Sequence, residues 1–145
     1  MEINQLKQKF IELYGGSEQD IRVFSAAGRV NLIGEHIDYC GGKVFPAALN
    51  LRTVVLARKN NENVIRLAAT TVKQREELNL STLDAYKGLK WGDYQAGVAY
   101  VMQNEGYKIV GADTLYDTTV PFASGLSSSA SIEVATAMML ATFSA

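Results

Sequence analysis

The chain has 145 residues, of which 48% are hydrophobic and 20% charged, and its formal net charge is −1. This composition is typical of one folded domain and argues against a disordered chain. The near-zero charge favours neither nucleic acid nor an anionic membrane as a partner, and we predict neither. The single cysteine, Cys40, cannot form an internal disulfide, and the N-terminus shows no signal-peptide pattern, so we expect a cytoplasmic protein.

Apolar spacing predicts helices at the start and in the middle of the chain. Residues 3–14 carry apolar side chains at helical intervals, and Gly15 and Gly16 follow, so we expect an amphipathic helix with a glycine stop. A second helix is predicted to end at Gly106. Its periodic positions are Trp91, Tyr94, Val98, Val101 and Met102.

Strand-like segments lie between and after these helices. Residues 21–27 form the first, and residues 44–49, which include Pro46, suggest an edge strand or a bulge. Residues 53–57 and 64–68 flank a short polar stretch, so we predict a hairpin. A further strand is expected within residues 109–120.

The last helix is predicted from Ser129 to Leu140 and is apolar almost all round. Such a helix is normally buried on every side. No C-cap is recognisable between it and Ala145. We therefore expect that the chain is truncated and lacks the partners that would bury this helix.

Residues 28–42 combine several glycines with a cluster of polar side chains. Carboxylates that accept two hydrogen bonds each suit the vicinal hydroxyls of a sugar. The alternative is a polar turn in which Arg29 pairs with one acid. Residue types alone leave both interpretations open. The polar residues are Arg29, Asn31, Glu35, His36 and Asp38.

The whole stretch, Gly-Arg-Val-Asn-Leu-Ile-Gly-Glu-His-Ile-Asp-Tyr-Cys-Gly-Gly, closely resembles the sugar-binding signature of galactokinases. That family usually has Thr in place of Ile37 and Asn in place of Cys40. The resemblance implies that Arg29 stabilises charge on a transferring phosphoryl group. The substrate-binding residues that it implies are Glu35, His36, Ile37 and Asp38.

Residues 121–131 lie between a predicted strand and the last helix. A helix N-terminus offers free N–H groups and a positive dipole end, which together bind phosphate. The stretch is neither a Walker A loop nor a dinucleotide fingerprint, and it lacks the second glycine of a serine-hydrolase elbow. The alternative is a serine N-cap on a buried helix.

This second stretch resembles the phosphate loop of the GHMP kinases (galactokinase, homoserine, mevalonate and phosphomevalonate kinases), Pro-x-x-x-Gly-Leu-x-Ser-Ser-Ala. Ala123 departs from a common glycine, and Thr118-Thr119 from a common Gly-Asp or Gly-Asn. The resemblance implies that the loop wraps the phosphates of ATP and that Ser129 is a Mg²⁺ ligand. The nucleotide-binding residues would be Ala123, Ser124, Gly125, Leu126, Ser127, Ser128 and Ser129.

A weaker similarity concerns Trp91-x-x-Tyr94-x-x-Gly97-Val98, because a similar pattern lies beside the adenine in the family. An aromatic stripe at helical spacing is also typical of a core, and both interpretations stay open. The family tends to have Ser-x-Asn where this chain has Ala69-Thr70-Thr71, and we assign no role to those residues.

The resemblance covers residues 1–145 and implies an incomplete N-terminal galactokinase lobe without its C-terminal domain. The implied fold is α+β, a ribosomal-protein-S5-like mixed sheet with helices packed on one side. The implied reaction is ATP-dependent phosphorylation of the C1 hydroxyl of α-D-galactose, with Mg²⁺ and no obligate protein partner.

In the family, the aspartate that accepts the proton and a glutamate of the Mg²⁺ site would lie beyond Ala145. We therefore expect residues 1–145 alone to be inactive. Two alternatives to a galactokinase are another GHMP sugar kinase, such as one for N-acetylgalactosamine, and a non-catalytic sensor that binds galactose and ATP.

Overall fold

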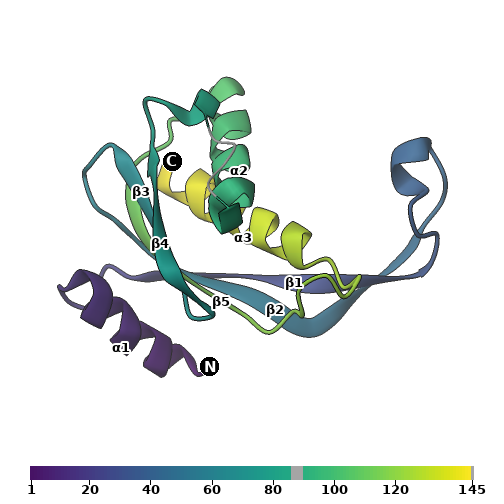
Figure 1. Cartoon of the computed structure of the whole chain (residues 1–145), viewed down its shortest axis with the longest axis horizontal. Helices are drawn as coiled ribbons and strands as arrows, with labels where there is room; N and C mark the ends of the chain where they lie inside the picture. Colours follow the sequence, from purple (N-terminus) through teal and green to yellow (C-terminus); the bar gives the residue numbers. More distant parts are fainter. Residues whose placement is uncertain (86–89, 145) are drawn as a thin grey trace.

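The computed structural model describes residues 1–85 and 90–144, in which three helices lie on the two faces of a five-stranded sheet (Figure 1). The helices are α1 (Ile3–Tyr14), α2 (Asp93–Asn104) and α3 (Ser128–Ser144). The strands are β1 (Arg22–Ile33), β2 (Phe45–Lys59), β3 (Val64–Ala69), β4 (Val72–Asn79) and β5 (Ala112–Thr118). The predicted α+β class is therefore confirmed.

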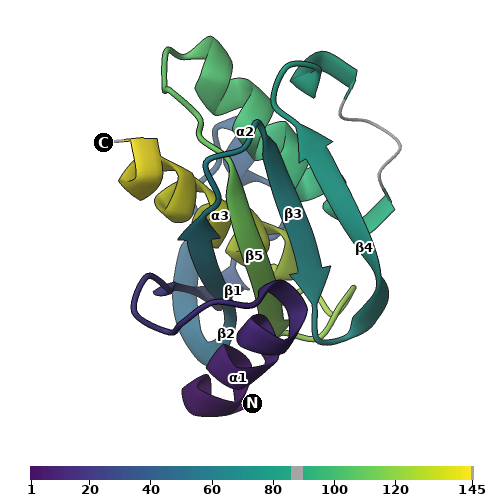
Figure 2. The ribbon, with the colours of Figure 1, turned by 90° about the vertical axis from the view of Figure 1, so that its left-hand side faces the viewer.

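The strand order is β1-β2-β5-β3-β4, and every neighbouring pair is antiparallel except β3 and β5 (Figure 2). The predicted hairpin between residues 53–57 and 64–68 is wrong, because β5 lies between β2 and β3. Most side chains of β5 are buried, and its apolar residues Ala112, Leu115 and Tyr116 lose the most water contact in a central position. The short polar loop therefore connects β2 to β3, although these two strands are not neighbours in the sheet.

Strand β4 is not among the predicted elements. Most of its side chains are exposed, and Leu78 is its buried residue. The segment includes Lys73, Arg75, Glu76 and Glu77. Charged side chains suit the edge of a sheet, where they discourage pairing with another chain. The same charges hide the alternation by which a strand is recognised in sequence.

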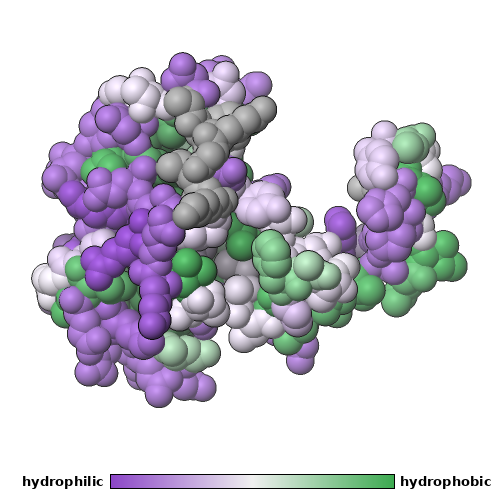
Figure 3. Space-filling view, in the orientation of Figure 1, coloured by the Kyte–Doolittle hydropathy of each residue, from purple (hydrophilic) through white to green (hydrophobic). Residues whose placement is uncertain are grey.

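The strands β1 and β2 continue beyond the sheet as a two-stranded arm, which carries residues 38–40 in a 3₁₀ turn at its tip (Figure 1). The predicted first strand thus extends past residue 27. Pro46 lies opposite Asn31, next to a register irregularity, in a part of β2 that is paired with β1 and not with β5. The prediction of an edge or a bulge there is confirmed. Apolar side chains such as Ile33 and Phe45 are exposed on this arm (Figure 3).

The core has two parts, one on each face of the sheet. Alternate residues of β2 serve both, because Val55 and Ala57 face α2 and α3 whereas Leu56 faces α1. Leu6 and Phe10 of α1 are fully buried against that second face. The expectation of helices on one side is therefore correct for α2 and α3 and wrong for α1 (Figure 2). The physical reason is that β2, β3 and β5 each contribute apolar side chains to both parts of the core, so both faces of the sheet need cover.

The helices α2 and α3 differ from their predicted burial. The buried residues of α2 are Gln95, Ala96 and Ala99, while Val101 is 56% exposed. In α3, Val134 and Met138 are 53% and 51% exposed, which confirms that part of this apolar helix is uncovered. Within residues 1–85 and 90–144, no helix combines the length and apolar character required to cross a membrane.

Candidate functional site

The two glycine-containing segments singled out in the sequence meet at Gly28. The backbone N–H of Arg29 donates a hydrogen bond to the carbonyl oxygen of Leu126, at 2.9 Å. A Cβ atom added to Gly28 would lie 2.9 Å from that same oxygen and 3.1 Å from a methyl group of Val120. Only glycine therefore lets β1 and the loop after β5 approach this closely. The contact places Arg29, the predicted transition-state stabiliser, directly beside the predicted phosphate loop.

The loop before α3 has an alternating backbone conformation. Ala123, Gly125 and Ser127 have φ values of +56°, +77° and +63°, and the residues between them do not have positive φ. Alternation of this kind turns successive N–H groups toward one concave side, which suits an anion. Two of the three positive-φ residues are not glycine, so the loop holds an uncommon conformation where a ligand is expected.

Helix α3 begins directly after this loop. The N–H of Ser131 donates to the carbonyl of Ser127 at 3.0 Å, whereas the N–H groups of residues 128–130 precede this first helical donor and have no carbonyl acceptor within the helix. Ser129, the predicted metal ligand, is half-buried in this first turn. The predicted nucleotide-binding residues thus form one continuous loop and helix N-terminus.

A chain of hydroxyl groups fixes the start of α3 to the sheet. The Oγ1 atom of Thr53 lies 3.1 Å from Oγ1 of Thr118 and 2.6 Å from Oγ of Ser131. Ser131 is also placed to donate to the carbonyl of Ser128 at 3.0 Å, and the N–H of Val120 donates to Thr118. Thr53 and Ser131 are fully or almost fully buried. Because buried hydroxyls require partners, this chain holds β2, β5 and α3 in one relative position.

The predicted sugar-binding residues lie at the tip of the arm. Gly34, with φ +102°, and His36, with φ +59°, form the turn that leads out of β1, and the side chains of Glu35 and His36 are exposed. Ile37 accepts hydrogen bonds from the N–H groups of Cys40 and Gly42 through its carbonyl. This backbone pattern closes the tip into a compact turn.

The structure does not bring every predicted sugar ligand into contact with the loop. Among residues 1–85 and 90–144, no hydrogen bond or ion pair joins Glu35 or His36 to residues 121–129, and Arg29 forms no ion pair with Glu35. The side chain of Asp38 lies outside the described part of the structure. The ring of His36 meets that of Tyr39 edge to face, with centroids 6.3 Å apart.

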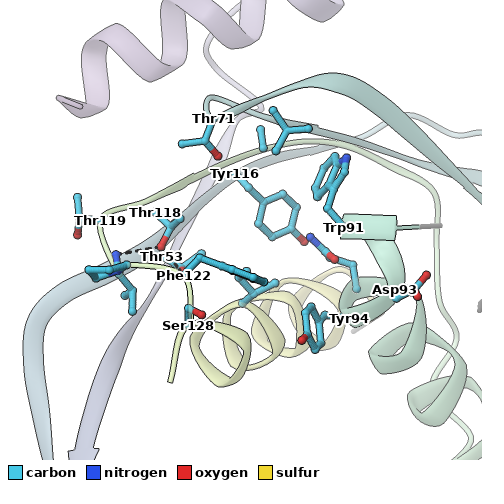
Figure 4. A pocket seen from close by; sticks show the side chains of 16 residues that line it. Thr53, Thr71, Trp91, Asp93, Tyr94, Tyr116, Thr118, Thr119, Phe122 and Ser128 are labelled. Atoms are coloured by element: carbon cyan, nitrogen blue, oxygen red, sulfur yellow. Dashed lines mark hydrogen bonds between the residues drawn. The ribbon is translucent and has the colours of Figure 1, made fainter. Parts of the chain in front are cut away.

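A cavity of about 890 Å³ opens beside the phosphate loop (Figure 4). Trp91 and Tyr94 both line it, as do Phe122 and Ser128, so the third sequence pattern lies at a cavity wall next to the loop. Tyr94 is 40% exposed, whereas Trp91 donates from Nε1 to the carbonyl of Gln74 at 3.1 Å. Trp91 also packs against the core, so both interpretations of this pair stay open.

The sequence offered no signal for several other residues of this cavity. These residues are scattered over separate strands and helices, so they form no recognisable sequence motif. Tyr116 is buried, which raises the pKa of its hydroxyl, so the phenol remains neutral in its hydrogen bond of 2.8 Å with Thr136. The lining residues that had no predicted role are Thr53, Ala69, Thr71, Val72, Asp93, Gln95, Tyr116, Thr118, Thr119, Val120 and Ile132.

Mg²⁺ requires oxygen ligands, usually one or two carboxylates together with phosphate oxygens and water. In the part of the chain that the structure describes, no three His, Cys, Asp or Glu side chains gather in a way that could hold a metal ion. The loop and the N-terminus of α3 thus fit a phosphate group. For a metal ion, the described residues supply the Ser129 hydroxyl and no cluster of carboxylates.

Two family descriptions match this chain in separate segments. The galactokinase galactose-binding signature matches residues 8–59, which include the arm. The GHMP kinases N terminal domain matches residues 93–145, which include the loop and α3.

Curated proteins and solved structures give the same result. Galactokinases of Clostridium tetani and Bacillus subtilis are 46% and 37% identical, over 97% and 96% of this chain and 35% and 36% of their own lengths. The structure of Lactococcus lactis galactokinase complexed with galactose has a TM-score of 0.86 and 36% identity, covering 92% of this chain and 35% of that one.

Mevalonate kinase of Methanococcus jannaschii, with a TM-score of 0.73 and 20% identity over 88% of this chain and 41% of its own, shares the fold. The chain thus spans about a third of the length of the curated relatives it matches.

The hydroxyl chain predicts a specific stability effect. Replacement of Thr53 by Val should lower the free energy of unfolding by about 1–3 kcal/mol, because the buried hydroxyl of Ser131 and the half-buried hydroxyl of Thr118 lose a partner. Urea unfolding measures this change. Thr142→Val is the matched control, since Thr142 is exposed and bonds only within its own helix to the carbonyl of Met138. Equal stability of the two variants would show that the Thr53 hydroxyl contributes nothing.

Proposed function

We propose that this chain, which belongs to the galactokinase family of GHMP kinases, is the N-terminal lobe of an enzyme that phosphorylates galactose. The enzyme would transfer the γ-phosphoryl group of ATP to the C1 hydroxyl of α-D-galactose. The observation that carries this proposal is the contact at Gly28, since it joins the segment expected to bind sugar to the loop expected to bind phosphate. A cytoplasmic location fits its single cysteine.

On the sugar side, we assign the hydroxyl contacts to Glu35, His36 and Asp38, with Ile37 completing the turn. Their carboxylates and imidazole suit vicinal hydroxyls that both donate and accept. The side chains of Glu35 and His36 are exposed on the arm and therefore accessible. Their role is to orient the C1 hydroxyl, because phosphoryl transfer depends mainly on positioning and charge neutralisation.

On the phosphate side, we assign residues 123–129 to the phosphates of ATP. The alternating backbone and the N-terminus of α3 both present N–H groups to an anion. Mg²⁺, when bound, would neutralise phosphate charge, with the Ser129 hydroxyl as one ligand. We assign the adenine ring of ATP to the cavity lined by Trp91 and Tyr94, because this cavity adjoins the loop at Ser128.

In the proposed step, the C1 oxygen of galactose forms a bond to the γ-phosphorus while the bond from that phosphorus to the β,γ-bridging oxygen breaks. ADP leaves with the electron pair, and the proton of the C1 hydroxyl group passes to a catalytic base. Arg29, whose backbone N–H donates to the loop at Leu126, would stabilise charge on the transferring group through its guanidinium. We propose that the catalytic base, which accepts the hydroxyl proton, and a carboxylate ligand for Mg²⁺ come from a part of the enzyme other than residues 1–145.

The direct test is ADP release by the full-length protein with Mg-ATP and one of several sugars. We expect release that depends on galactose and is far weaker with N-acetylgalactosamine or without sugar. A polypeptide of residues 1–145 should show none, because loss of the base alone lowers the rate by about 10²–10⁴. Binding of galactose and ATP without ADP release would instead identify a sensor.

Ser129 provides a test of the phosphate side. Ser129→Ala should shift the Mg²⁺ dependence of turnover and raise the KM for Mg-ATP about tenfold, by loss of a charge-assisted contact. Galactose affinity should stay unchanged. Ser144→Ala, at the other end of α3, is the control. If the Ser129 variant retains the wild-type Mg²⁺ dependence, Ser129 is a helix residue without a role in metal binding.

A further inference from the structure

The amide of Gln95 has an unusual environment. Gln95 is 1% exposed, and its Oε1 atom is buried without any hydrogen-bond partner. Among the described residues, the other buried side-chain atom of this kind is Oδ1 of Asn31, on the arm. A buried carbonyl oxygen without a donor is costly and uncommon, so the structure should offer a reason for it.

A second glutamine in the same helical position shows what the ordinary arrangement is. Gln5 is the third residue of α1, and its Oε1 accepts a hydrogen bond of 3.2 Å from the N–H of Glu2, which completes a capping box. Gln95 is likewise the third residue of α2, but Gly92 makes no such capping bond with it. Gln95 instead lines the cavity beside Tyr94 and Tyr116.

The cavity indicates which ligand would supply the missing donor. Aromatic side chains of Trp91, Tyr94 and Phe122 line it, and the N-terminus of α3 lies at its edge. A planar base attached to phosphates fits both features, since the ring would lie among aromatic groups and the phosphates at the loop. The last torsion of a glutamine side chain is soft, so its amide can turn the oxygen toward a base in the cavity.

We propose that Gln95 is a specificity residue that accepts a hydrogen bond from the exocyclic amino group of adenine. This inference rests on the proposed use of ATP and adds the residue that reads the base. Glutamine suits adenine because its amide pairs with an amino donor and a neighbouring ring nitrogen. A base without that amino group would leave Oε1 without a partner, as it is in the free protein.

The test compares ATP with purine riboside triphosphate, which lacks only the 6-amino group, in calorimetric titrations of the full-length protein. The wild type should bind ATP about fivefold more tightly, which is the value of one neutral hydrogen bond. In Gln95→Met, whose side chain has similar length and no amide, the two nucleotides should bind about equally. An unchanged preference for ATP in this variant overturns the assignment.

Stability of the nucleotide-free protein gives a second, independent readout. Because the variant removes a buried oxygen without a partner, Gln95→Met should raise the melting temperature by about 2–4 °C. Gln5→Met is the matched control. It should lower the melting temperature by loss of the capping box and leave the nucleotide preference unchanged. A fall in the melting temperature of Gln95→Met would show that Gln95 is a structural residue.

The same titrations distinguish failure of the proposed ATP binding from failure of the Gln95 contact. If the wild-type protein binds neither nucleotide, the proposed function fails, and the role of Gln95 fails with it. If both nucleotides bind and the Gln95 variant keeps the wild-type preference, the proposed function stands and only the base contact is refuted.

Discussion

The close approach of β1 to the loop after β5 is the contact on which the arrangement of this lobe depends. The backbone of Arg29 donates to the loop at Leu126, and Gly28 leaves room for that loop at a distance no other residue tolerates. On one side of this point the strand enters the sheet, and on the other it becomes the arm. Both segments expected to bind substrates are therefore held at one point of the fold.

The central position of β5 makes this contact possible. Because β5 lies between β2 and β3, its last residues arrive beside β2, where the Thr53 and Thr118 hydroxyls lie close together. The chain then crosses over β1 as a loop and returns as α3, whose Ser131 meets Thr53. The cavity is lined by the first residues of α2 and α3 and by the last residues of β5.

Local patterns in the sequence predicted those features that depend on near neighbours. Apolar spacing and two glycines predicted α1, and the segment after Pro121 was correctly predicted to be a loop followed by a helix. The pairing of β2 with β5 could not be predicted in this way, because it depends on burial over a long sequence separation. The edge strand β4 could not be predicted either, because it carries no apolar alternation. The charged side chains that suit it to the edge of the sheet replace that pattern.

The candidate site shows the same division. The arm and loop residues were singled out because they form long local motifs, and their binding roles stay predictions. Thr53 and Gln95 gave no signal, since their contacts arise from neighbours in space. Because Gln95 is the third residue of α2, its sequence position suggests a capping hydrogen bond like the one that Gln5 accepts from Glu2 in α1. Gln95 differs in that it is buried at a cavity wall with an unpartnered oxygen, whereas Gln5 is exposed.

The central claim is that contact at Gly28 sets the position of the phosphate loop, and calorimetry of Mg-ATP binding to a Gly28→Ala protein tests it most directly. The added methyl group would lie 2.9 Å from the Leu126 oxygen, so the loop must move away from β1. Overpacking of this kind costs about 1–3 kcal/mol, and we predict that Mg-ATP binds at least about fivefold more weakly while the protein stays folded. A folded variant that binds Mg-ATP with wild-type affinity would contradict the account.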